Sequence, residues 1–165
     1  MNNYFVMTSD NRALKDKKIQ LEDRRFLKEE PFVSYLNFDK GEKLPDFIQG
    51  KCENQTFFCI SQAMKDIFDA YVSFQKEIPV FFTDSQFRNQ SVYWIIDLIE
   101  KDCLIQDFYA DRFHLTFRYS PEDGQYLWKT KNIRTVYVIV SLELAENLLR
   151  RQMYGLCFSP VLNRT

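Results

Sequence analysis

Glycine is scarce in this chain, which holds only four in 165 residues: Gly41, Gly50, Gly124 and Gly155. Loops that cradle a phosphate or a dinucleotide need closely spaced glycines, because glycine lets the backbone turn tightly and approach the phosphate. No two of these glycines lie close enough in sequence to form such a loop. The scarcity therefore excludes a phosphate-binding loop and a dinucleotide-binding fingerprint.

Cysteine and histidine are also few. The four cysteines, Cys52, Cys59, Cys103 and Cys157, include no Cys-x-x-Cys pair, and His114 is the one histidine. A cysteine–histidine zinc site needs ligands at characteristic spacings, and these residues do not supply them. We therefore expect no metal, no cofactor, and reduced thiols that are mostly buried.

The chain has neither a long apolar run nor a strong charge of either sign. No run approaches the roughly 20 apolar residues that a membrane span needs, and residues 1–18 contain no apolar signal core. The net charge of −1 and pI of about 5.9 argue against nucleic acid as the main partner. The sequence thus predicts a cytoplasmic protein without membrane contact, and its length fits a single domain over residues 1–165.

Aromatic residues are abundant, at 16% of the chain. A core filled by aromatic rings accounts for such a content, and a ligand cage or a base-stacking surface is the alternative. Residues 12–28 carry a local charge of +4, which fits either a solvated meander or a basic contact patch.

Residues 91–111 form the most informative segment. An apolar, strand-like run from Val92 to Ile99 leads into a series of carboxylates. Lys101 is the one basic residue among them, so residues 97–111 carry a local charge of −4. We expect a buried strand that delivers an acidic turn to the surface, where it meets a partner; a solvated turn is the alternative. The residues predicted to contact the partner are Asp97, Glu100, Asp102, Asp107, Phe108, Tyr109 and Asp111.

Two segments share a strand–helix–strand plan. Strand-like runs end at Ser61 and at Ser141, and apolar residues at helical spacing follow each serine. Serine is a preferred N-cap, because its hydroxyl accepts a hydrogen bond from an otherwise unpaired helix N–H. Further apolar runs, 78–82 and 155–161, complete the two units.

The remaining segments suggest more strands. Residues 4–7 open the chain as a strand, residues 113–118 alternate as a half-buried strand, and residues 125–129 could pair back on it as a hairpin. Residues 31–50, with Gly41, Pro45 and Gly50, predict loops and turns. We therefore expect an α+β fold, with a mixed or mostly antiparallel sheet flanked by a few helices.

Catalytic chemistry finds little support. His114 lies on the polar face of its predicted strand without a local nucleophile or carboxylate, and the acidic neighbours of Cys103 should raise its thiol pKa. The spacing of Asp102, Asp107 and Asp111 does not match a calcium loop. An enzyme that uses His114 or Cys103 remains an alternative, but the sequence favours a protein without catalytic residues.

The order of these features resembles a family of bacterial immunity proteins from polymorphic toxin systems, numbered eleven among immunity families and formerly a domain of unknown function. The resemblance covers residues 44–161 and rests on short motifs: Leu44-Pro45-Asp46-Phe47, the segment 57–68, Ile78-Pro79-Val80, the segment 92–104 with Asp102-Cys103-Leu104, the segment 136–149, and Gly155 with Phe158. Residues 1–43 are divergent and match the family poorly, and Ile105 stands where the family often has aspartate.

The resemblance implies a non-enzymatic, cytoplasmic protein that binds and neutralises a cognate toxin domain. It supplies no catalytic residues. An acidic segment suits this role, because toxins that act on nucleic acids have basic clefts that attract negative charge. A small-molecule or nucleotide-binding regulatory domain is the second hypothesis, and it would require a deep aromatic-lined pocket. The sequence leaves the oligomeric state open.

Overall fold

The structure is a computed structural model that describes residues 3–14, 30–36, 38–52, 55–109, 112–118, 121, 124–131 and 133–162, with the backbone alone for 11, 14, 52, 106–109 and 112–113. Two compact units divide the chain. The α1 unit comprises residues 9–97 and 153–156, and the α2 unit comprises residues 1–8, 98–152 and 157–165. A single domain over residues 1–165 stays a prediction.

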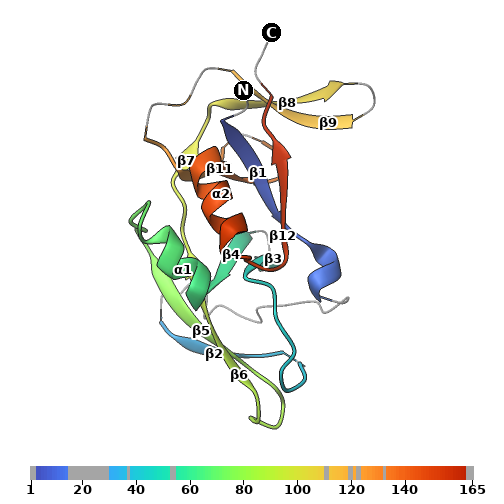
Figure 1. Ribbon diagram of the computed structural model, residues 1–165, viewed down its shortest axis with the longest axis vertical. Coiled ribbons are helices and arrows are strands. Elements are labelled where there is room, and N and C mark those ends of the chain that lie inside the picture. Colours follow the sequence, from blue (N-terminus) through green and yellow to red (C-terminus); the bar gives the residue numbers. More distant parts are fainter. Residues whose placement is uncertain are drawn as a thin grey trace. The chain divides into compact units, whose positions relative to one another are not determined.

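The α1 unit contains a five-stranded sheet in the order β2-β5-β6-β4-β3 (Figure 1). Its elements are β2 (Phe32–Tyr35), β3 (Phe47–Cys52), β4 (Gln55–Ser61), α1 (Gln62–Phe68), β5 (Glu77–Thr83) and β6 (Gln90–Ile96), and a short 3-10 turn, η1, spans Asn11–Leu14. The β2–β5 pair is parallel, whereas β5–β6, β6–β4 and β4–β3 are antiparallel. The expected mixed sheet is therefore confirmed.

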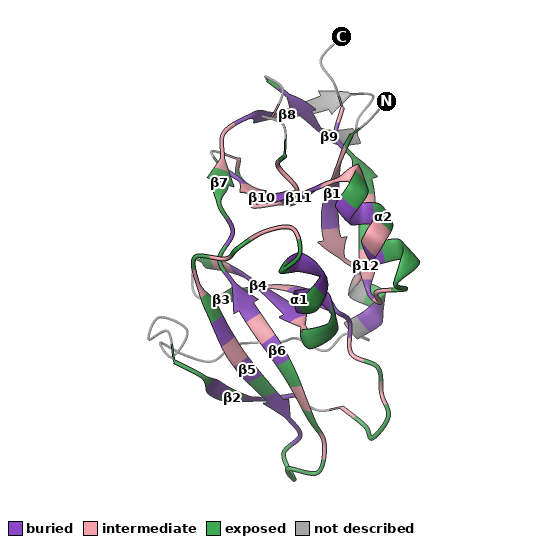
Figure 2. Cartoon of the chain, turned by 60° about the vertical axis from the view of Figure 1, so that its left-hand side comes forward, coloured by how far each residue is buried: buried purple, intermediate pink, exposed green. Residues whose placement is uncertain are grey.

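The sheet of the α1 unit buries hydrophobic side chains on both of its faces. Alternate residues of its strands, among them Phe57, Val80 and Ile95, form one hydrophobic cluster. On the opposite face, α1 lies against β4 and β6 (Figure 2). Its residues Met64, Ile67 and Phe68 are buried there. Because α1 has only seven residues, it covers only part of this face.

The α2 unit contains the sheet β12-β1-β11-β10-β7 and the two-stranded ladder β8-β9. Its elements are β1 (Tyr4–Ser9), β7 (Glu100–Lys101), β8 (Leu104–Tyr109), β9 (Arg112–Phe117), β10 (Leu127–Thr130), β11 (Val138–Ser141), α2 (Leu142–Arg150) and β12 (Leu156–Pro160). The aromatic core is confirmed here, since Tyr4 packs edge-on against both Phe117 and Trp128. A sheet-rich fold with few helices is thus the observed architecture.

Both predicted strand–helix–strand units are present, as β4–α1–β5 and β11–α2–β12. The hydroxyls of Ser61 and Ser141 accept hydrogen bonds from Met64 N and Leu144 N, each at 3.2 Å, so both serines are N-caps as predicted. The opening strand is also confirmed, as β1. In the part of the chain that the structure describes, neither helix has the length and apolarity to cross a membrane.

Two predictions about local structure were wrong. Residues 31–50 are not all loop, because β2 and the first part of β3 lie there. Gly50 is a strand residue beneath the ring of Phe57, its partner on β4, and a Cβ at this position would overlap Phe57 Cζ. Residues 125–129 do not pair back on β9, since β10 pairs antiparallel with β11 and parallel with β7.

Candidate functional site

The acidic segment predicted to meet a partner is not one turn. Asp97 is exposed and follows β6, Glu100 is exposed on β7, and Asp102 is partly buried between β7 and β8. Leu98 and Cys103 lie close to these carboxylates in sequence, and their buried side chains anchor the segment to the protein. Asp97 belongs to the α1 unit, whereas Glu100 and Asp102 belong to the α2 unit.

The other predicted contact residues fall on a strand. Asp107, Phe108 and Tyr109 belong to β8, whose backbone pairs with β9 so that Asp107 lies opposite His114. Asp111 lies outside the described residues, as does most of the basic segment 12–28. The prediction of a single turn was wrong, because residues 104–109 form a strand that pairs antiparallel with β9.

The structure adds no support for nucleophilic chemistry at Cys103. Its side chain is buried, and burial is the largest cause that raises the pKa of its thiol. The Asp102 charge acts in the same direction, while the backbone hydrogen bond and Lys101 oppose it. The sequence correctly predicted a raised pKa for the Cys103 thiol, but attributed it to the neighbouring carboxylates and not to burial. Cys59 is buried too, whereas Cys157 is exposed.

The described residues contain no group of three or more His, Cys, Asp or Glu side chains that could hold a metal ion. Two adjoining hollows, of about 710 and 490 Å³, lie in the α1 unit between residues 38–46 and 84–93. Most of the residues that line them are polar or charged, such as Asp84, Arg88 and Asn89. They are not the deep aromatic-lined pocket that a small-molecule binder would need.

A surface that sequence reasoning missed lies on the face of the α1-unit sheet that α1 leaves open. Exposed apolar side chains of β2, β5, β6 and the β5–β6 turn lie there. We call it the sheet-face surface, and it consists of Val33, Tyr35, Phe81, Phe87 and Val92. The alternation of β2, Phe32–Tyr35, was the sequence signal that could have revealed it.

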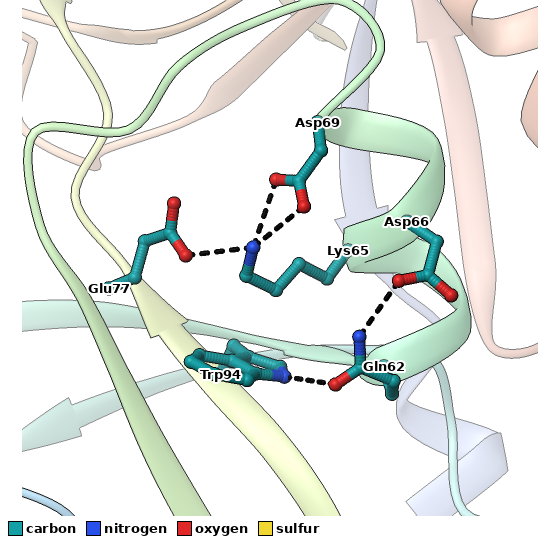
Figure 3. A network of polar contacts seen from close by, with 6 residues as sticks. All are labelled: Gln62, Lys65, Asp66, Asp69, Glu77 and Trp94. Atoms are coloured by element: carbon teal, nitrogen blue, oxygen red, sulfur yellow. Dashed lines mark hydrogen bonds and ion pairs between the residues drawn. The ribbon is translucent and has the colours of Figure 1, made fainter.

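A polar network borders this surface beneath α1 (Figure 3). Lys65 Nζ lies 2.7 Å from Asp69 Oδ2 and 2.7 Å from Glu77 Oε2, and 5.0 Å from the centre of the Trp94 ring. Gln62 accepts a hydrogen bond from Trp94 Nε1 at 2.7 Å and donates one to Asp66 at 2.8 Å. The network therefore fixes Trp94 and concentrates carboxylates beside it.

Burial of the Lys65 side chain acts to lower its pKa, but the hydrogen bonds and charges of Asp69 and Glu77 outweigh burial, and the net pKa is raised. Lys65 thus stays a cation that joins α1 to β5.

No protein-family model matches the chain, and a search of curated proteins finds no match.

Proposed function

We propose that this protein is a non-enzymatic immunity protein that binds and neutralises a cognate bacterial toxin domain in the cytoplasm, and that its α+β fold acts as a rigid binding scaffold. The motif resemblance motivates the proposal. Its structural support is the sheet-face surface, because contiguous exposed apolar side chains on a folded protein mark sites of protein interaction. The described residues contain no metal cluster, and the two hollows are lined mostly by polar and charged residues, which is compatible with this role and does not establish it.

The acidic segment is the second part of the proposal. Asp97 and Glu100 are exposed and could contribute to electrostatic steering of a basic toxin without a change in the core. Asp102, Asp107, Phe108, Tyr109 and Asp111 remain proposed contact residues.

Co-expression tests the proposal. The chain is expressed in a sensitive bacterium with the toxin domain encoded beside its gene, and we expect growth to be restored and the two proteins to co-purify. Reversal of Asp97 and Glu100 to lysine should slow association most strongly at low salt. Failure to protect any cell from the neighbouring gene product, or turnover of a metabolite that depends on His114, would contradict the proposal.

A further inference from the structure

The sheet-face surface is concentrated in one place. Of the seven large hydrophobic side chains that are exposed in the described residues, five belong to it. Val33, Phe81 and Val92 are direct neighbours in register across β2, β5 and β6, so they form one continuous row. Tyr35 extends the row on β2 and contacts Phe87 edge-on, with ring centroids 5.7 Å apart. Side chains scattered at random would not share a register.

The structure holds Phe87 at an energetic cost. Its φ of 57° lies in the left-handed region, which is strained for a bulky residue. The carboxylate of Asp84 builds the turn, since it accepts hydrogen bonds from Gln86 N at 3.0 Å and Arg88 N at 2.9 Å. The aromatic pair Tyr35–Phe87 is therefore ordered before any partner binds, and a preordered aromatic pair loses little conformational entropy on binding.

One end of the apolar row is acidic. Pro79 pairs with Trp94 and continues the row toward α1, where Asp69 and Glu77 contact the ammonium group of Lys65 and Asp66 accepts a hydrogen bond from Gln62. The three carboxylates and the single ammonium group drawn in Figure 3 carry a net charge of −2. The charges of Lys76 and Asp97, which adjoin Glu77 and Ile96 in sequence, offset each other. The cation Arg88 lines the hollow with Phe38 and Lys40 instead.

We infer that the sheet-face surface and its acidic end together form the docking site for a protein surface that presents lysine or arginine beside apolar side chains. The inference rests on the proposed function in that this partner would be the toxin domain. Charge selects this occupant. A second copy would bring two acidic ends of the same kind into one interface, and nucleic acid or an anionic membrane would be repelled.

A selection experiment tests the occupant directly. The purified full chain is used to select binders from a displayed library of random linear peptides, and affinities of the enriched peptides are measured at low and high salt. We expect enriched peptides to combine lysine or arginine with aromatic or aliphatic residues. Tyr35→Ala and Phe87→Ala should each weaken binding about tenfold, as for aromatic residues at the centre of an interface.

Matched variants distinguish specific binding at this surface from nonspecific binding. Asp66→Lys should weaken binding and reduce its salt dependence, whereas Glu146→Lys, which reverses an exposed acid on α2, should leave both unchanged. Leu149→Ala removes another exposed apolar side chain and serves as the control for Phe87→Ala. Thermal unfolding of every variant shows whether the fold is intact.

Three results would overturn the inference. The enriched peptides could be neutral or acidic, or they could bind Tyr35→Ala and Phe87→Ala as tightly as the unchanged chain. Light scattering could instead show a dimer that Phe87→Ala dissociates, which would make a second copy the occupant.

Protection of cells distinguishes this inference from the proposed function. If the chain protects a cell from its toxin and the sheet-face variants protect equally well, the inference fails and the proposed function stands. If basic peptides bind selectively at this surface but the chain protects no cell, the docking site stands and the proposed function fails.

Discussion

Asp46 accepts a hydrogen bond of 2.6 Å from the hydroxyl of Ser61, the same hydroxyl that caps α1. The second carboxylate oxygen of Asp46 accepts one from Tyr154 N, also at 2.6 Å. One buried carboxylate therefore fixes the start of α1 and ties it to residues 153–156, far along the chain. The Leu44-Pro45-Asp46-Phe47 motif has a structural role at this point.

Replacement of Ser61 by alanine should destabilise the protein more than replacement of Ser141. Both hydroxyls cap a helix with the same 3.2 Å hydrogen bond, but only Ser61 also donates to Asp46. Loss of a cap costs about 1 kcal/mol, and a buried carboxylate left without its donor adds about 1–2 kcal/mol. Chemical denaturation of the two variants measures the difference.

A double-mutant cycle checks the cause. Because Ser61 and Asp46 interact directly, the combined effect of Ser61→Ala and Asp46→Asn should be smaller than the sum of the separate effects. Full additivity, or equal losses for Ser61→Ala and Ser141→Ala, would show that the hydrogen bond contributes nothing to stability.

Replacement of Lys65 by methionine should lower the free energy of unfolding by about 1–2 kcal/mol. The change leaves Asp69 and Glu77 without their shared cation, although both carboxylates are partly exposed and screened by solvent. Arg150→Met is the control, since its pair with Glu146 is exposed and should contribute less than about 0.5 kcal/mol.

The Lys65 effect should also depend on pH. Because the folded state raises the pKa of Lys65 above 10.5, its ion pairs stabilise the fold below that pH and are lost as pH rises through the folded pKa. The stability difference between Lys65→Met and the unchanged chain should therefore shrink in strong alkali. A difference that grows there would contradict this sign.

Asp84→Asn should weaken the β5–β6 turn and reduce the acid sensitivity of the protein. Backbone N–H groups, that of Arg88 first among them, lower the pKa of Asp84 below 3.8 in the folded state. The resulting stability is present above that pH and is lost as pH falls through the folded pKa. Denaturation between neutral and acidic pH should show the variant's deficit disappearing in acid, and a constant deficit would exclude the carboxylate charge as its cause.

Gly50→Ala should cost more than Gly41→Ala, for a different reason. A methyl group on Gly50 would overlap the buried ring of Phe57, which makes the cost one of overpacking, about 2–3 kcal/mol. Gly41 has open space and only its φ of 80° opposes alanine, which costs about 1 kcal/mol. If Phe57→Leu does not relieve part of the Gly50→Ala loss, the overlap is not the cause.

Local signals predicted much of this fold. The serine caps, the helices after them and the strand β1 depend on neighbouring residues, so the sequence pattern was sufficient. The edge strand β2 was missed because the turn formers Gly41 and Pro45 dominated the interpretation of residues 31–50, although Phe32 and Ser34 are buried and Val33 and Tyr35 are exposed in alternation.

Long-range pairing was harder to predict. Asp107 and His114 share a register only because β8 pairs with β9, and Lys65, Glu77 and Trp94 meet from three different elements. Charge counting along residues 97–111 could not find the acidic network beneath α1, since its members are spread over residues 62–94. The sheet-face surface likewise exists only once β2 joins β5.

The strand order of the α1 unit determines when a newly synthesised chain can complete its sheet. β6 inserts between β4 and β5, so a ribosome must release residue 96 before those two strands gain their shared neighbour. Tyr154, whose N–H donates a hydrogen bond to Asp46, is synthesised later still. The two strands that flank β1, which are β11 and β12, are also synthesised long after β1 itself. The two sheets are consequently completed only after residue 160 has been made, and any role that depends on both of them starts only then.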